Sequence, residues 1–343
     1  MSKSNKKFMS RIPHDKIGLM MALVVIVLVF SFFNKNYFSS ANVMNILIAA
    51  SLTGLVAIGE TYLIIAGMVD LSAGSVAAFA SVLAAVLLSK GFNLFITIVV
   101  VIVAGAIIGY INALGVNKVK LEPFIATLAT MSIIRGFAYI ICDGKPVYIS
   151  NQSVIAFGKN RLLGIPMPVI ILILAFIVFG IVLAKTRFGR SVYVIGGNKE
   201  AARLAGLNPQ KITTTLFMIT GALSTLGGFI LAARMSSGQP AAANGLEFDA
   251  ITAAVLGGTA FSGGVGTIFG TVLGVLILQG FNTGLIMLNV PVFWQFVARG
   301  LLLVIALAFD YIRKRNREKK LLAQSMAAIT ENSAAMQKEK SRF

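Results

Sequence analysis

Charged residues, cysteine and histidine are scarce in this chain of 343 residues. Only 12% of the residues are charged, whereas soluble domains have about a quarter; 57% are hydrophobic, and the mean hydropathy is +0.88. This composition excludes a soluble protein and predicts a chain that crosses a membrane several times. The one cysteine, Cys142, cannot form an internal disulfide. One histidine and one cysteine cannot supply a zinc cluster, so we expect no metal site.

Sequence motifs of enzymes are also missing. The chain contains no Gly-Lys-Ser or Gly-Lys-Thr, and therefore no phosphate-binding loop of its own. It has neither a His-Glu-x-x-His pair nor a Gly-x-Ser-x-Gly nucleophile turn. We therefore expect a protein that is not an enzyme and that binds no cofactor itself.

The net charge of +18 is unevenly distributed. Lysine and arginine concentrate in the N-terminal tail, in the region 185–211 and in the C-terminal tail. Such clustering is typical of loops that stay on the cytoplasmic side of a membrane. It predicts cytoplasmic N- and C-termini, and it argues against nucleic acid as the partner.

Ten apolar segments have roughly the length of a membrane span. The predicted spans are 17–33, 44–66, 71–89, 94–116, 122–142, 165–184, 211–233, 248–262, 264–288 and 292–311. They divide the chain into a cytoplasmic N-tail (1–16), a transmembrane domain (17–311) and a basic cytoplasmic C-tail (312–343). The fold class is therefore an all-α polytopic membrane helix bundle.

Two features of the predicted spans bear on transport. Ten spans form two halves of five, and an odd number of spans in each half gives the halves opposite orientations, as in many transporters. The third and eighth spans both begin near an aspartate, Asp70 and Asp249. The eighth span, 248–262, is short and rich in glycine. It is either a broken helix that lines a cavity or a segment whose glycines allow close packing.

A short polar island, residues 196–209, interrupts the apolar runs. Asn198 can cap a helix there, Glu200 complements the positive end of its dipole, and Gly206 lets the chain leave it. A helix so short needs a surface to dock on, and its charged residues exclude the membrane as that surface. The sequence therefore predicts a docking helix for a soluble partner.

Polar residues inside the predicted spans are candidates for a transport pathway, because each is costly to bury in lipid. Arg135 lies about 18 Å into its span, where it either pairs with a carboxylate or lines the pathway. Asp70 can also serve as an ordinary helix cap, and buried amides also bridge helices without any transport role. The candidates are Asp70, Ser72, Asn112, Arg135, Gln279 and Asn282.

Several of these motifs together resemble a known family. The island and its flanks, 185–190 and 196–206, are similar to the cytoplasmic coupling loop of ribose-type monosaccharide ABC transporter permeases. Other stretches that resemble the family are 70–74, 247–251, 256–259, 263–266 and 282–285, with Gln295 and Asp310. Ala66 and Ala260 depart from the family pattern, since glycine and serine respectively are usual there.

The resemblance implies a permease in the inner membrane that imports a monosaccharide. It implies four partners: an ATP-binding cassette subunit that binds and hydrolyses ATP, an extracytoplasmic sugar-binding protein, a second copy of the chain, and the sugar itself. It also implies that the island couples the permease to the ATPase through Asn198, Glu200, Ala201, Ala202, Arg203, Leu204 and Gly206.

Two other functions remain open from the sequence. One is an ion-coupled secondary sugar transporter with Glu60 or Asp70 as a proton site. The other is a membrane scaffold whose polar island recruits a soluble complex. The sequence does not identify the sugar.

Overall fold

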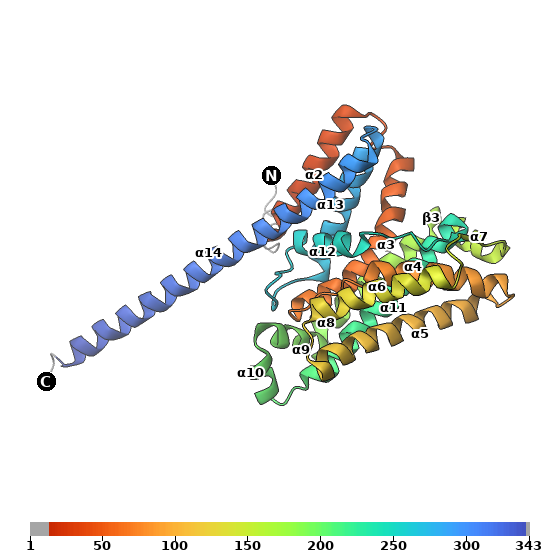
Figure 1. Ribbon diagram of the computed structural model, residues 1–343. Coiled ribbons are helices and arrows are strands. Elements are labelled where there is room, and N and C mark those ends of the chain that lie inside the picture. Colours follow the sequence, from red (N-terminus) through yellow and green to blue (C-terminus); the bar gives the residue numbers. More distant parts are fainter. Residues whose placement is uncertain (1–13, 341–343) are drawn as a thin grey trace.

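The computed structural model describes residues 14–340, most of which are helical (Figure 1). Most of the predicted N-tail, residues 1–13, lies outside the described residues. The helices are α2 (His14–Phe33), α3 (Ser40–Ile65), α4 (Ala73–Ser89), α5 (Leu94–Leu114), a π-helical turn (Gly115–Val119), α6 (Pro123–Ile140), α7 (Gln152–Lys159), α8 (Met167–Lys185), α9 (Arg187–Gly197), α10 (Lys199–Leu204), α11 (Pro209–Met235), α12 (Leu246–Leu256), α13 (Ile268–Met287) and α14 (Val292–Lys340).

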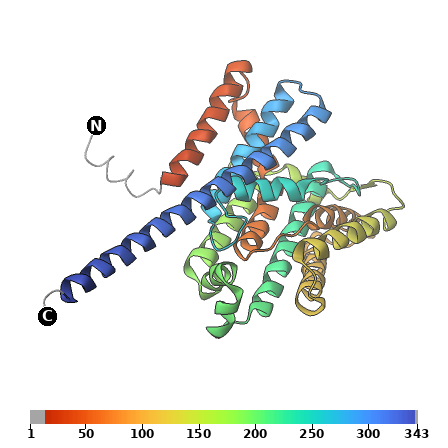
Figure 2. The same ribbon diagram turned by 60° about the vertical axis from the view of Figure 1, so that its left-hand side comes forward.

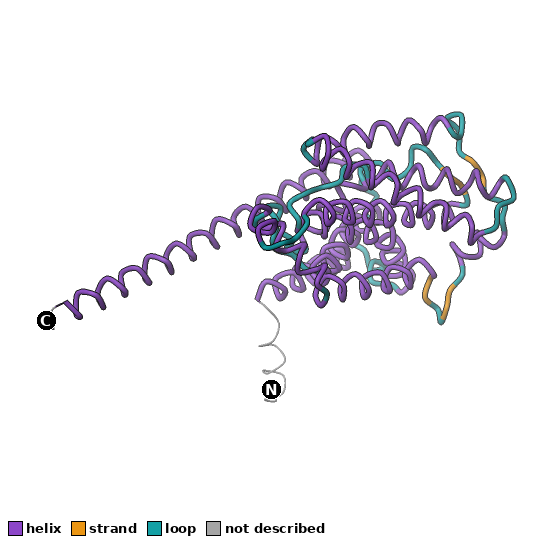
Figure 3. Tube along the Cα trace, turned by 90° about the horizontal axis from the view of Figure 1, so that it is seen from below, coloured by secondary structure: helices purple, strands orange, loops and turns teal. Residues whose placement is uncertain are grey.

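Four two-residue strands form two small antiparallel pairs. They are β1 (Val147–Tyr148) with β4 (Ser237–Gly238), and β2 (Arg161–Leu162) with β3 (Ile165–Pro166). These strands and the short helix α7 were not predicted from the sequence. They lie at the end of the bundle remote from the C-terminal part of α14 (Figure 3).

Local sequence signals set where several helices begin. The side chains of Ser39, Asn93 and Thr186 cap α3, α5 and α9 by accepting a backbone N–H from the first turn. Pro123 opens α6, where its missing N–H removes no helical hydrogen bond. Asn208 caps α11 in the same way as the first three, since its Oδ1 accepts the N–H of Lys211 at 3.0 Å.

Each of the ten predicted spans contains a helix. Among the described residues, eight helices are long and apolar enough to cross a membrane, which confirms a polytopic all-α membrane protein. The other two are shorter, with 17 residues in α4 and 11 in α12. At 1.5 Å per residue, α12 covers about 17 Å, well below the ~30 Å of a hydrocarbon core.

The predicted span 248–262 is helical only as far as Leu256. The chain leaves α12 after Leu256 and turns at Gly258, whose φ is +89°. Gly257 packs directly on Gly270 near the start of α13, where a Cβ would overlap the carbonyl group. This glycine therefore serves close packing, one of the two roles considered for the segment.

The centre of the bundle is α11, which packs against α3, α4 and α5. In its most apolar window 72% of the residues are buried, against 11% for α2 and α14 at the periphery. The contact with α5 is made at glycines, because a Cβ at Gly221 would overlap the carbonyl oxygen of Gly105. Backbone therefore meets backbone between these two helices.

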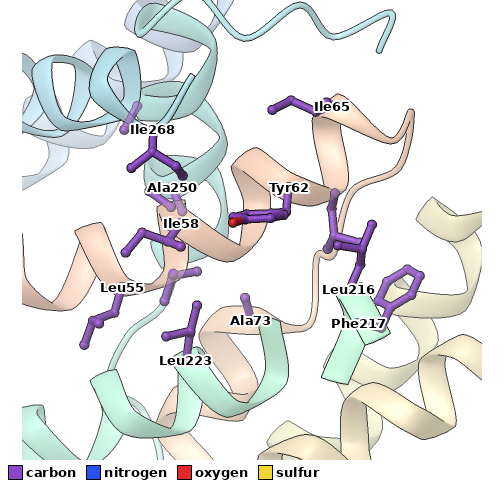
Figure 4. Close-up of a cluster of buried hydrophobic side chains, with 14 of the residues drawn as sticks. Leu55, Ile58, Tyr62, Ile65, Ala73, Leu216, Phe217, Leu223, Ala250 and Ile268 are labelled. Carbon is purple, nitrogen blue, oxygen red and sulfur yellow. The ribbon is translucent and has the colours of Figure 1, made fainter. Parts of the chain in front are cut away.

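A hydrophobic cluster fills the space between α3 and α11 (Figure 4). Leu55, Ile58 and Tyr62 of α3 are fully buried there, as are Leu216 and Phe217 of α11. Tyr62 buries its ring and still satisfies its hydroxyl, which donates to the carbonyl of Phe179 in α8 at 2.6 Å.

The elements outside the bundle gather at its two ends. Helices α9 and α10 project at the end from which the C-terminal part of α14 also extends, and α7 lies at the opposite end (Figures 1 and 2). Helix α14 has 49 residues and continues without a break past residue 312, where the C-tail was predicted to start.

Candidate functional site

Helix α10 forms where the docking helix was predicted. Asn198 Oδ1 accepts the N–H of Ala201 at 2.9 Å and caps the helix, and Gly206, with φ of +81°, lets the chain turn away after it. Glu200 Oε2 lies 3.1 Å from Arg203 Nε, but both side chains are more than two-thirds exposed. That ion pair contributes little to stability and leaves both groups accessible.

The predicted docking residues fall on two faces of α10. The side chain of Leu204 is 83% exposed, and Ala201 and Arg203 are exposed as well. Ala202, in contrast, is fully buried inside the chain. Ala202 therefore fixes α10 on the rest of the chain, and Ala201, Arg203 and Leu204 form its exposed outer face.

Helix α9 connects α10 to the membrane-embedded helices. Gly196 packs on the last turn of α3, where a Cβ would overlap the carbonyl oxygen of Ile65. The hydroxyl of Tyr193 donates to the carbonyl of Gly266 at 2.8 Å, in the segment between α12 and α13. Burial raises the pKa of the Tyr193 phenol above its ordinary value, so it stays protonated and keeps this bond. Helix α9 thus contacts both the end of α3 and the segment between α12 and α13.

A buried polar cluster lies at the start of α4. We call it the α4-start cluster, and it consists of Glu60, Asp70, Ser72, Asn112 and Thr127, all less than 2% exposed. Asp70 Oδ1 accepts the backbone N–H and the hydroxyl of Ser72, and Asn112 Nδ2 donates to Ser72 Oγ at 3.0 Å. Glu60 Oε2 accepts the backbone N–H of Asp70 at 3.3 Å. Thr127 Oγ1 accepts the backbone N–H of Leu71 at 3.1 Å.

The structure thus brings together three of the predicted pathway residues, Asp70, Ser72 and Asn112. The alternative role of Asp70 as a helix cap is wrong in detail, because the cap residue of α4 is Ser72; Asp70 instead holds the turn before the helix through its bonds to Ser72. Glu60 Oε1 and Asn112 Oδ1 have no hydrogen-bond partner within residues 14–340. Such free acceptors suit a donor supplied from outside, for example a hydroxyl group.

Arg135 lines a cleft on one side of the α4-start cluster. Its Nη1 donates to the carbonyls of Pro240 and Ala242 at 2.9 and 2.7 Å, and its Nε donates to Ser75 Oγ at 3.2 Å. It therefore joins α6 to α4 and to the segment before α12. The cleft holds about 470 Å³, and its polar lining residues are Ser75, Ser132, Arg135, Tyr139, Asn244 and Glu247.

Glu247 is the least expected member of this cleft. It is 3% exposed, and its Oε2 lies against Gly74, without a hydrogen-bond partner in the described part of the chain. Its position near the first turn of α4 is favourable for a carboxylate. Glu247 stands in the first turn of α12, and its approach to α4 depends on tertiary packing, which the sequence pattern does not show.

A second cleft, of about 420 Å³, lies on the other side of the cluster. Its walls include Met68, Lys120, Pro123, Asn198 and Thr213. Along α6, Pro123 of this cleft, Thr127 of the cluster and Met131 of the Arg135 cleft follow one another at one-turn intervals. The α4-start cluster therefore separates two polar openings, one of which reaches the docking helix.

Two predicted pathway residues lie elsewhere, in α13. Gln279 Nε2 donates to Thr53 Oγ1 of α3 at 2.8 Å, which is the helix-bridging role considered for buried amides. Asn282 is buried, and neither residue lines the two clefts.

Glu60 and Thr127 were not among the predicted pathway residues. Within residues 14–340 no group of three His, Cys, Asp or Glu side chains is placed to hold a metal ion.

A helical membrane fold with a projecting docking helix and polar openings on both sides of a buried cluster defines a transport permease. Residues 42–307 match the family model described as branched-chain amino acid transport system / permease component. The chain belongs to this family.

Curated relatives agree over most of the chain. A ribose import permease protein of Bacillus subtilis (strain 168) is 40% identical over 86% of this chain and 92% of its own length. A ribose import permease protein of Haemophilus influenzae is 38% identical (84% and 91%), and an L-arabinose transport system permease protein of Escherichia coli (strain K12) is 38% identical (88% and 92%). No solved structure matches. The resemblance to ribose-type sugar ABC permeases is thereby confirmed.

Proposed function

We propose that this chain is the permease subunit of an ABC importer that carries a pentose or hexose monosaccharide across the inner membrane. The observation that carries the proposal is the 38–40% identity to ribose and arabinose permeases over more than four-fifths of the chain. The ATP-binding cassette subunit binds and hydrolyses ATP, and an extracytoplasmic binding protein delivers the sugar. Two copies of the chain form the membrane part, with α10 and both termini in the cytoplasm.

The proposed architecture has ten membrane helices in two inverted halves, α2–α6 and α8–α14. The packing of the helices supports it. Helix α11 of the second half packs against α4 and α5 of the first half. Helix α3 of the first half packs against α12 and α13 of the second half. Arg135 of α6 reaches Ser75 at the start of α4, and Arg299 of α14 lies 3.8 Å from Asp249 at the start of α12.

The proposed domains are the N-tail 1–16, the transmembrane permease domain 17–311 and the C-tail 312–343, with the coupling loop at 185–210.

The proposed pathway passes through the Arg135 cleft, the α4-start cluster and the cleft beside α10. Amide, hydroxyl and carboxylate groups in these places suit an uncharged solute with many hydroxyls. Closure of the ATPase subunits moves α10, and α9 carries this movement to the end of α3.

The test is uptake into vesicles that contain the permease, its cassette subunit and the binding protein. We expect labelled ribose or arabinose to enter only with ATP, and sugar with its binding protein to stimulate ATP hydrolysis. Vesicles that show neither effect for any sugar of a monosaccharide panel would refute sugar import.

An ion-coupled sugar transporter is the second candidate. The observation in its favour is the contact between Glu60 and Asp70, two fully buried carboxylate residues on the proposed pathway. A protonophore added at constant ATP separates the two functions. Uptake that continues supports the ABC importer, and uptake that stops supports coupling to an ion gradient.

A further inference from the structure

A groove between α2, α8 and α13 lies apart from the two clefts described above. It holds about 570 Å³, which is within the range of small-molecule pockets, about 300–1,000 Å³. Its long wall is apolar and open to the membrane, since the side chains of Ile177, Ile181 and Phe269 are each about half exposed. A hydrocarbon chain would fit this wall without leaving any polar group unsatisfied.

One end of the groove is basic. Lys16, near the start of α2, and Lys185, the last residue of α8, both line it. Lys16 Nζ lies 5.0 Å from the centre of the Phe269 ring, which holds the ammonium over the groove. Within residues 14–340 neither ammonium forms an ion pair with a carboxylate. Two positive charges at the mouth of an apolar groove therefore have no carboxylate partner in the part of the chain that the structure describes.

We propose that the groove binds one anionic phospholipid, with an acyl chain along α8 and α13 and the phosphate between Lys16 and Lys185. An apolar wall selects a hydrocarbon chain, and two free ammonium groups select a headgroup with net negative charge. The inference rests on the proposed function at one point only. If α10 lies on the cytoplasmic side, the lipid belongs to the inner leaflet of the membrane.

The lipid site touches the coupling elements. Tyr193 of α9 lines the same groove, and its hydroxyl bonds to Gly266, the residue before Thr267 of the lining. A lipid seated there would contact α8, α9 and α13 together and would brace α9, which carries the docking helix. Anionic lipid would then raise the coupling between ATP hydrolysis and transport.

Native mass spectrometry of the purified full chain, with phosphatidylglycerol or phosphatidylcholine added to the detergent, tests the proposal. We expect phosphatidylglycerol to be retained in preference. Each of Lys16→Gln and Lys185→Gln should weaken its binding about fivefold, the usual effect of one basic side chain near anionic lipid. Lys118→Gln is the matched control, because Lys118 is exposed on the α10 side but does not line the groove.

A second variant blocks the groove and keeps both lysines. A Cβ at Gly180 would lie 3.7 Å from Ile268 Cγ2, an ordinary contact, so Gly180→Leu places its side chain in the groove without strain on the backbone. This variant should also release the lipid. The proposal is overturned by equal retention of the two lipids, by an equal effect of Lys118→Gln, or by unchanged binding in Gly180→Leu. None of these outcomes depends on transport.

Discussion

The backbone N–H of Gly264 donates to the carbonyl oxygen of Ile65 at 2.8 Å. This bond ties the irregular segment after α12 to the last turn of α3, and Gly196 of α9 packs on the same carbonyl. Three separate parts of the chain thus meet at one backbone oxygen, directly between the docking helix and the α4-start cluster.

Replacement of Gly196 tests this junction. In Gly196→Ala the new methyl group overlaps the Ile65 carbonyl, so we expect a loss of about 1–3 kcal/mol in stability and a fall in ATP-driven uptake. Thermal unfolding in detergent and vesicle uptake measure the two effects. Gly197→Ala is the control, because a Cβ at Gly197 meets no described atom within 4 Å. Equal behaviour of the two variants would contradict the role of the junction.

Leu204→Asp should release the cassette subunit and leave the permease folded. The side chain of Leu204 is 83% exposed, so the change removes apolar surface that only a partner can cover. Co-purification of the cassette subunit measures the effect. Leu163→Asp, a change at an equally exposed leucine beside β2, should retain the subunit. Wild-type recovery with Leu204→Asp would exclude this face of α10 as the docking surface.

Asp70→Ala and Asp70→Asn should differ. Alanine leaves the buried N–H and hydroxyl of Ser72 without their acceptor, at a cost of about 1–3 kcal/mol for each buried group. Asparagine retains an acceptor oxygen at the same place, so it should keep most of the stability. Melting temperature and uptake of both variants check this. If asparagine destabilises as much as alanine, the negative charge itself is needed.

Arg135→Lys should be almost as harmful as Arg135→Ala. Arginine donates from Nη1 to two carbonyls and from Nε to Ser75, and a single ammonium group cannot reproduce this geometry. We expect reduced uptake and a stability loss of about 2 kcal/mol or more. Arg161→Lys, at an exposed strand residue, is the control. Full activity of Arg135→Lys would show that only the charge of Arg135 matters.

Local signals in the sequence were sufficient for α10 and for the beginnings of several helices. Asn198, Asn208 and Pro123 act within one helical turn of their own position, so a single sequence contains all the information needed. The inward orientation of Ala202 depends instead on where α10 is fixed by α9. The sequence shows that α10 has two opposite faces. It does not show which of them packs against the rest of the permease.

The α4-start cluster could be predicted only in part. Asp70 and Ser72 are neighbours in the chain, but Asn112 is 40 residues away from Ser72 and reaches it only through the packing of α5. The charge of Glu60 within an apolar run was a usable signal, and Glu247 offered none, since its place at the start of α12 already explained it. The end of α12 was left open by the sequence because its glycines fit both a helix interior and a turn.

The glycine contact between α5 and α11 restricts how the protein can change shape. Where Gly105 and Gly221 meet, no side chain stands between the two backbones that could rotate to absorb a shift. One of these helices cannot slide along the other unless the two first separate. The two helices therefore behave as one rigid unit. A movement of α5 would therefore carry α11 with it, and a change in the polar openings would come from the elements packed around this pair.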